Sequence, residues 1–255
     1  MYAKHHHNPI LILLIGLVFF VFLGCEGTKH EQPSLRIGLI KHHSLILEGK
    51  TGAARVQLRQ YMEKYGEYSH PLFLMGLSYH SEQSYSKAAQ WLTRSTHDQN
   101  NPYPLAWHFL GWSQLYLGDI DGAQLSFEQF LRAYPDEPDS IFAFGLLAME
   151  RGELQEAKGF FKNVIRLAAT NKRIRAKAMA RLGDVLIELD DMSGAMSAYK
   201  EALQGNPDLY EAWYRYATSL KRLGRMSESN EALVHFEEAR KRVRPDLYQQ
   251  TGFPE

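Results

Sequence analysis

Histidine and cysteine are the residue types from which a metal site or a nucleophilic site is most often built, and this chain has eleven histidines and one cysteine. None of the histidines belongs to an HExxH motif, to a Cys/His cluster or to another recognised ligand spacing. His42 and His43 are adjacent, so their side chains would diverge by about 100° on a helix. The sequence therefore predicts no metal site.

The glycines, serines and acidic residues give no catalytic motif either. No GxGxxG, GxxxxGK[ST] or GxSxG pattern is present, and acidic pairs such as Asp190-Asp191 are typical of solvated turns. Lys+Arg and Asp+Glu both number 29, so the net charge does not indicate a nucleic-acid partner. We expect no catalytic residue, no cofactor and no small-molecule substrate, and hence a protein that is not an enzyme.

Cys25 is the single cysteine, so the chain can form no internal disulfide. It follows an unbroken apolar stretch at residues 10–23, and the nine residues before that stretch include Lys4 and no acidic residue. Fourteen helical residues reach about 21 Å, which is short of the hydrocarbon core of a bilayer, at about 30 Å. This combination is typical of a signal peptide.

The junction Phe22-Leu23-Gly24-Cys25 resembles the lipobox of bacterial lipoproteins. That resemblance implies cleavage after Gly24, which removes residues 1–24, and attachment of a diacylglyceryl group to Cys25. Phe22 stands where leucine is usual, and Leu23 is bulkier than the common alanine or serine. A plain N-terminal anchor helix beside a bystander cysteine remains the alternative.

The residues after Cys25 are polar, and we interpret residues 25–34 as a lipidated tether. In diderm bacteria aspartate directly after the lipidated cysteine is a signal for retention in the inner membrane. Glu26 therefore favours the periplasmic face of the outer membrane.

An internal repeat occupies the rest of the chain. Gly76, Gly111, Gly145, Gly183 and Ala217 are separated by 35, 34, 38 and 34 residues. Twelve residues after each of these positions comes a small residue: Ala88, Ala123, Ala157, Ala195 and Ser229. Sixteen residues after each comes a large one: Leu92, Phe127, Phe161, Tyr199 and Leu233. Small residues of this kind let the two helices of a repeat approach closely, and stacking of neighbouring repeats supplies the core.

The third of these units resembles the tetratricopeptide repeat. It carries the pattern W-x2-LG-x6-G-x4-A-x3-F-x7-P on Trp107, Leu110, Gly111, Gly118, Ala123, Phe127 and Pro135. The resemblance implies an all-α, right-handed superhelical solenoid of about six helix-turn-helix repeats. We place this repeat domain at residues 35–243, followed by a C-terminal tail at 244–255. The expected repeats lie near 35–68, 69–103, 104–137, 138–175, 176–209 and 210–243.

Two repeats depart from the pattern. Gly38 and Lys41 stand where large apolar residues belong, which predicts a degenerate first repeat. The step from Gly145 to Gly183 is four residues too long, and we expect the excess near residues 171–174, as one extra helical turn or as a longer loop.

In proteins of this family the first helix of each repeat lines a concave groove that holds a protein or peptide partner. Carried over by repeat position, the groove residues expected here are Phe73, Leu77, His80, His108, Trp112, Tyr116, Phe142, Leu146 and Met149. We expect Trp107, Phe127 and Phe161 to pack between helices instead. The alternative is that Phe73, Trp112 and Phe142 belong to the packing core and that the register is off by one.

The function expected from these features is that of a membrane-anchored adaptor or scaffold in a bacterial cell-envelope assembly, of the pilus, secretion or outer-membrane biogenesis type. The alternative is a regulatory adaptor of a peptidoglycan hydrolase or protease. The expected partners are a protein or peptide in the groove and the membrane through the lipid, without nucleic acid.

Overall fold

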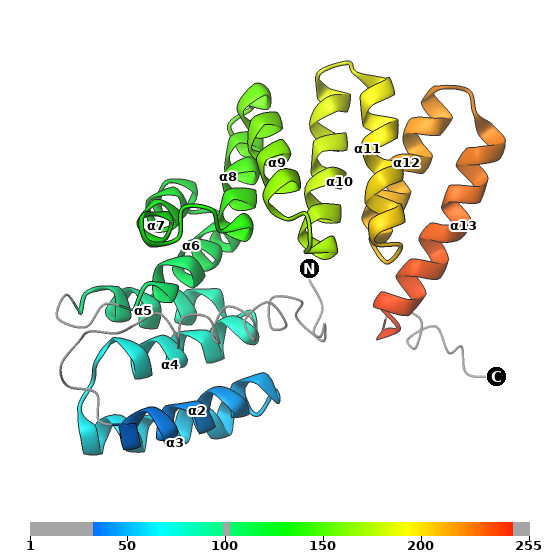
Figure 1. Ribbon diagram of the computed structural model, residues 1–255. Helices are drawn as coiled ribbons and strands as arrows, with labels where there is room; N and C mark the ends of the chain where they lie inside the picture. Colours follow the sequence, from blue (N-terminus) through cyan, green and yellow to red (C-terminus); the bar gives the residue numbers. More distant parts are fainter. Residues whose placement is uncertain (1–32, 99–102, 247–255) are drawn as a thin grey trace, which may run out of the picture. The chain divides into compact units, whose positions relative to one another are not determined.

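The computed structural model describes residues 33–98 and 103–246, and these residues form twelve α-helices and no strand (Figure 1). The helices follow one another in pairs along the chain. Their bounds are α2 (Pro33–Leu47), α3 (Thr51–Tyr65), α4 (Ser69–Ser81), α5 (Tyr85–Thr96), α6 (Leu105–Leu117), α7 (Ile120–Ala133), α8 (Pro138–Glu150), α9 (Leu154–Leu167), α10 (Lys172–Glu188), α11 (Met192–Gly205), α12 (Tyr210–Arg222) and α13 (Met226–Val243).

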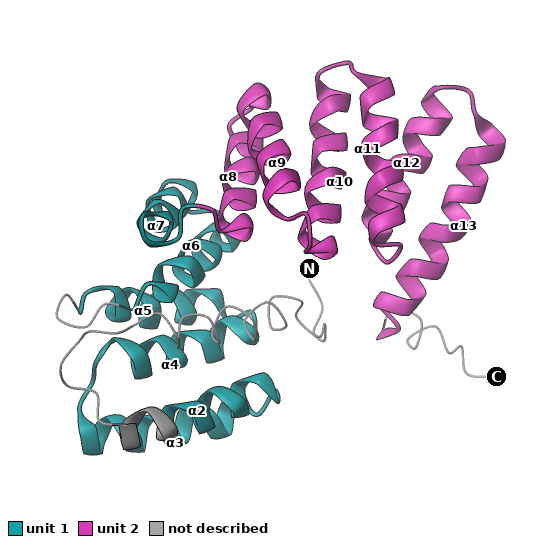
Figure 2. Cartoon of the chain, viewed as in Figure 1, with its two compact units in different colours: residues 1–135 teal, residues 136–255 magenta. Residues whose placement is uncertain are grey.

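The chain divides into two compact units, at the end of the third helix pair (Figure 2). Unit 1 runs from Met1 to Pro135 and contains α2–α7, whereas unit 2 runs from Asp136 to Glu255 and contains α8–α13. Within each unit, most of the extensive contacts are between helices that are consecutive in the chain. Among the described helices, none has the length and apolar character needed to cross a bilayer. Cys25 and the signal-peptide prediction lie outside the described residues.

The pairing of the helices rests on close approach at the repeated glycines. A Cβ atom added to Gly145 would lie 2.5 Å from Cε1 of Phe161, which is sixteen residues later on the partner helix. The same relation joins Gly76 to Leu92, Gly111 to Phe127 and Gly183 to Tyr199, at 2.5, 2.9 and 2.7 Å. The glycine therefore admits the large side chain of the second helix, as the repeat spacing predicts.

Short turns join the two helices of each pair. Gly118, Gly152 and Gly224 occupy the turns of the third, fourth and sixth pairs with φ between +72° and +79°, a conformation that L side chains rarely adopt. Asp119 and Asp191 then begin the following helices, because their carboxylates accept the backbone N–H three residues later at 3.0 and 2.8 Å.

The four extra residues of the fifth repeat extend its first helix. α10 has 17 residues, whereas the other first helices from α4 onward have 13. Asn171 caps α10 through a 3.4 Å bond from the N–H of Ile174 to its side-chain oxygen. Of the two possibilities considered from the sequence, the structure has the extra helical turn.

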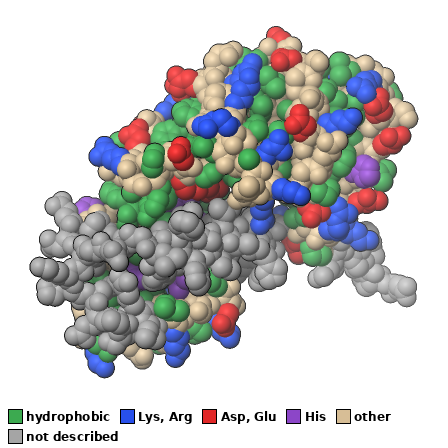
Figure 3. Space-filling view, viewed as in Figure 1, with side chains coloured by type: hydrophobic (Ala, Val, Ile, Leu, Met, Phe, Trp, Pro, Cys, Tyr) green, Lys and Arg blue, Asp and Glu red, His purple; other side chains and the backbone are tan. Residues whose placement is uncertain are grey.

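The last helix pair of unit 2 is filled differently from the core of unit 1. The core of unit 1 is rich in large aromatic rings, among them Phe73, Phe109 and Phe130, whereas the buried residues of the last pair of unit 2 are mainly alanine, serine and Leu220. On the face drawn in Figure 3, Lys and Arg side chains are interspersed with Asp and Glu over unit 2. That face presents no broad field of a single charge.

Candidate functional site

The groove residues predicted on α4 are buried. Phe73 and Leu77 are each 1% exposed. The centroid of the Phe73 ring lies 5.7 Å from that of Phe109 on α6. Phe73 also contacts Tyr103, at 4.7 Å between ring centroids. These side chains fill the space between the second and third helix pairs, so we correct their assignment from groove to core.

His80 is also part of this core. The Ser113 hydroxyl donates to the carbonyl of Phe109 at 2.8 Å, so it accepts the Nδ1–H of His80, at 3.0 Å. The imidazole lies edge-on to the rings of Tyr85 and Phe109, at 5.4 and 5.2 Å. Burial, and secondarily the nearby His108, lowers the pKa of His80 to about 3. His80 is therefore neutral near pH 7 and holds two first helices together.

The predicted groove residues on α6 separate into buried and exposed side chains. His108 and Trp112 are buried, and the Trp112 ring meets Phe127 of α7 edge-on at 5.6 Å. Trp112 was expected in the groove, but its ring packs against the second helix of its own repeat. Tyr116, one turn later, is 49% exposed. Trp107, expected to pack between helices, is partly buried and packs against the core of unit 1.

Tyr116 is the centre of a stacked aromatic group that we call the Tyr116 patch and define as Tyr85, Trp112 and Tyr116. The Tyr116 ring stacks on Tyr85 at 4.5 Å, with 26° between the ring planes. It stacks on Trp112 at 5.7 Å, with 30° between the planes. The Nε1–H of Trp112 has no hydrogen-bond partner among the described residues. Unit 1 thus exposes an aromatic ring that its neighbours hold in one orientation.

In unit 2, the predicted groove residues lie on α8. Phe142 is 7% exposed and its ring lies 5.4 Å from Phe161, so its assignment is also corrected from groove to core. Leu146 and Met149 are partly buried. Phe142 points towards the second helix of its own pair, as Trp112 does in unit 1.

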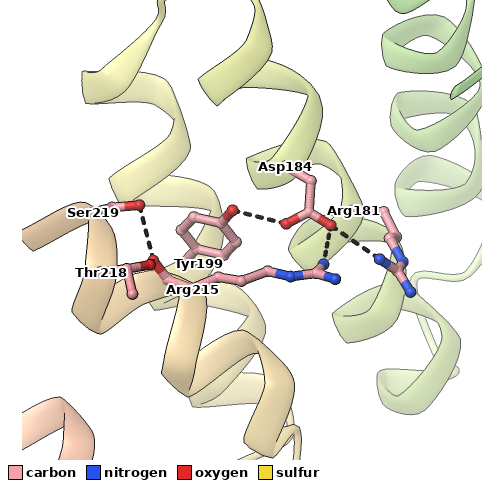
Figure 4. A network of polar contacts seen from close by, with 6 residues as sticks. All are labelled: Arg181, Asp184, Tyr199, Arg215, Thr218 and Ser219. Atoms are coloured by element: carbon pink, nitrogen blue, oxygen red, sulfur yellow. Dashed lines mark hydrogen bonds and ion pairs between the residues drawn. The ribbon is translucent and has the colours of Figure 1, made fainter. Parts of the chain in front are cut away.

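A charged cluster in unit 2 joins α10/α11 to α12/α13, the fifth and sixth helix pairs of the chain (Figure 4). Asp184 of α10 accepts three bonds: one from the Tyr199 hydroxyl at 2.8 Å, one from the Arg181 guanidinium at 3.1 Å and a short one from the Arg215 guanidinium. The Asp184 side chain is only 12% exposed, whereas those of Arg181 and Arg215 are 38% and 39% exposed. Two cations therefore share one nearly buried carboxylate.

The hydroxyl in this cluster does not ionise easily. Burial, and then the negative charge of Asp184 and the bond to it, raises the pKa of the Tyr199 phenol above its ordinary value. Tyr199 therefore remains a hydrogen-bond donor and fixes the Asp184 carboxylate. The hydroxyls of Thr218 and Ser219 donate to the carbonyl of Arg215, at 2.9 and 2.8 Å, one turn into α12.

Arg181 also belongs to a row of cations along α10. Arg173, Lys177 and Arg181 are spaced by four residues and so lie on one face of the helix; we call them the α10 cationic row. All three are partly buried. Burial lowers the pKa of Arg173 and is also the largest effect on Lys177, whose pKa is lowered. Asp139 of α8 and Glu211 of α12 oppose that effect on Lys177.

Most of this second surface was not predicted from the sequence, which did not single out Arg173, Arg181 or Arg215. The four-residue spacing of the row is visible in the sequence. The bond from Arg215 to Asp184 joins positions 31 residues apart and has no sequence signature.

Neither surface gathers a set of metal ligands. Within residues 33–98 and 103–246, no group of three or more His, Cys, Asp or Glu side chains is arranged to hold a metal ion. What the two surfaces offer is aromatic area and fixed positive charge.

Comparison with known proteins defines the repeat. A family model described as the tetratricopeptide repeat matches residues 110–172 and 142–209, which span α7–α11 and adjoining residues. These helix pairs are similar to tetratricopeptide repeats. The matched range includes Tyr116 and the α10 cationic row.

Solved structures of tetratricopeptide type have the same fold at low sequence identity. The APC/C hetero-tetramer Cut9-Hcn1 matches 94% of this chain and 44% of that chain, with a TM-score of 0.69 and 18% identity. Pseudomonas aeruginosa pilF matches over 83% of this chain and 92% of its own, with a TM-score of 0.66 and 15% identity. NprR in complex with its cognate peptide NprX matches over 92% of this chain and 77% of its own, with a TM-score of 0.62 and 16% identity.

A curated relative is similar over a shorter range. The CTR9 homolog of Arabidopsis thaliana is 30% identical over 137 residues, which are 52% of this chain. The match spans 12% of that protein's length. The likeness therefore covers only part of either protein.

Proposed function

We propose that this protein is an adaptor that binds a partner protein or peptide on the first helices of its repeats and is attached to a bacterial envelope membrane by a lipid on Cys25. The observation that carries the binding role is the Tyr116 patch. A half-exposed tyrosine stacked between Tyr85 and Trp112 offers a large apolar area at little entropic cost, because its neighbours already restrict the ring. Aromatic anchors of this kind dominate the energetics of many interfaces.

The setting that we propose is a pilus, secretion or outer-membrane biogenesis assembly. The support for it is the apolar stretch at residues 10–23 that ends in Gly24-Cys25, together with the fold likeness to pilF of Pseudomonas aeruginosa. NprR, which has the same fold, binds a peptide, and its likeness supports the peptide-binding part of the proposal.

The anchoring part is tested by mass spectrometry of the protein purified from a bacterial membrane. We expect a chain that begins at Cys25 and carries a diacylglyceryl adduct, and a Cys25→Ala variant that is neither cleaved nor lipidated at this position. An unmodified thiol on Cys25 in the membrane-derived protein would contradict the proposal.

The binding part is tested by affinity purification from solubilised envelopes with the wild type, Tyr116→Ala and Leu117→Ala. Leu117 is the matched control, because it adjoins Tyr116 and is 50% exposed. We expect the Tyr116 variant to lose most of the partner that the wild type recovers, and the Leu117 variant to keep it. Equal recovery by both variants would refute a role for the patch, and the recovered protein would distinguish an assembly component from a peptidoglycan hydrolase or protease.

A further inference from the structure

The α10 cationic row is an unusual way to build a helix face in a repeat. Like charges four residues apart on a helix repel each other and lower its stability, and this row contains two such pairs. Burial adds to that cost, because the structure holds Arg173 and Lys177 partly out of water. A side-chain arrangement that costs stability is more readily explained by a ligand than by the fold.

Carboxylates lie beside the middle of the row, whereas positive charge is in excess at each of its ends. Asp139 and Glu211 act on Lys177 from the two neighbouring first helices. Arg173 has no carboxylate partner among the described residues. At the other end, Arg181 and Arg215 have Asp184 as their single shared carboxylate. One positive charge is thus in excess at each end, and negative side chains lie beside the middle.

The two ends are separated by a fixed length. Arg173 and Arg181 are eight residues apart on one helix, which is about 12 Å along its axis. In an extended peptide, side chains four residues apart are about 13 Å apart. An extended segment lying along α10 would therefore bring two such carboxylates to the two ends at once. A carboxylate between them would meet the negative charges of Asp139 and Glu211.

We infer that unit 2 binds an extended acidic peptide segment whose two carboxylates are four residues apart, one contacting Arg173 and the other Arg181 and Arg215. Planar guanidinium groups bind carboxylates in bidentate geometry. Asp184, held by Tyr199, positions the guanidinium groups of Arg181 and Arg215, whose side chains remain 38% and 39% exposed. The inference names the partner chemistry for the first-helix surface and so rests on the adaptor function proposed above.

Fluorescence anisotropy with the full chain in uncharged detergent tests the inference directly. The probe is a labelled, C-terminally amidated peptide of Gly, Ser and Thr with two Glu residues four positions apart. Three comparison peptides have both Glu replaced by Gln, the two Glu placed two positions apart, or no Glu and a free C-terminal carboxylate. We expect the first peptide to bind about tenfold more tightly than each of the others, with an affinity that falls as salt is added.

Protein variants assign each carboxylate to its end of the row. Arg173→Gln should weaken binding of the probe peptide about tenfold. In that variant, replacing the peptide Glu that contacts residue 173 with Gln should weaken binding no further. Arg173→Lys keeps the charge and should keep most of the affinity. Arg175→Gln is the control, because Arg175 is on the same helix outside the row and lies 4.0 Å from Glu201.

Equal binding of the Gln peptide, equal binding of the peptide with only a C-terminal carboxylate, or an equal loss in Arg175→Gln would overturn the inference. If that happens while Tyr116→Ala still reduces partner recovery from envelopes, the adaptor function stands without it. If both assays fail, the adaptor function fails as well.

Discussion

The close approach of Gly145 to Phe161 gives a sharp prediction about stability. In Gly145→Ala, the new methyl group would lie 2.5, 2.7 and 2.9 Å from Cε1, Cζ and Cδ1 of the ring. Carbon atoms in ordinary contact are about 3.5–4.0 Å apart, so the ring must retreat by about 1 Å. Phe161 is fully buried and already contacts the Phe142 ring at 5.4 Å, which leaves it little room.

The expected magnitude follows from two opposing effects. Overpacking a filled core costs about 1–3 kcal/mol, and replacing a helical glycine with alanine recovers about 1 kcal/mol. Because the overlap is severe, we expect Gly145→Ala to lower the free energy of unfolding by about 1–2 kcal/mol. Gly159→Ala is the matched control: Gly159 lies in the partner helix α9, and nothing lies within 4 Å of its added Cβ. It should gain up to about 1 kcal/mol.

The assay is urea unfolding followed by helical circular dichroism. It compares the wild type, the single variants Gly145→Ala, Gly159→Ala and Phe161→Leu, and the double variant Gly145→Ala with Phe161→Leu. The smaller leucine makes room for the methyl group, so the double variant should be more stable than the sum of the two single changes predicts, by about 1 kcal/mol. If Gly145→Ala unfolds at the same urea concentration as Gly159→Ala, the close-approach argument is wrong.

Three further predictions concern the buried groups. Trp112→Ala should cost about 3–5 kcal/mol in thermal melts, as a large buried side chain does; a loss below about 1 kcal/mol would show that the ring is not core. Because folding lowers the pKa of His80 from 6.5 to about 3, the unfolded chain binds a proton that the folded chain does not. The contribution of His80 to the free energy of unfolding should therefore be fully present above pH 6.5. Below pH 6.5 the free energy of unfolding should fall by up to about 1.4 kcal/mol per pH unit. His80→Gln should flatten the dependence of the urea midpoint on pH. Asp184→Asn should cost about 1–3 kcal/mol, because Arg181 and Arg215 lose their shared carboxylate; unchanged melting would contradict the cluster's structural role.

The repeat register was predictable from the sequence because it depends on pairs of residues with a constant separation. Gly111 and Phe127, like Gly145 and Phe161, must be small and large for the same two helices to touch, so both types recur together. The turn glycines were predictable for a similar reason, since Gly118 and Gly152 need positive φ.

The groove residues were harder to predict, because a first helix is packed on several sides and exposes only a narrow arc. Successive residues are about 100° apart around the helix, so a small error in assigning the arc exchanges core and surface. Trp112 and Phe142 were assigned to the groove by their repeat position, but both side chains are buried against the second helix of their own pair. Tyr116 does lie on the exposed arc. The charge cluster at Asp184 depends on contacts between repeats, which no local pattern reveals.

The measurement that tests the adaptor role most directly is site-specific photocrosslinking in bacterial cells. A photoreactive phenylalanine analogue is placed at Tyr116, on the first helix of the third repeat, or at Leu125, which is 61% exposed on the second helix of that repeat. If the first-helix surface binds a partner, position 116 should give a discrete crosslinked protein and position 125 should give none. The same crosslinked product from both positions, or a product from position 125 alone, would contradict the account.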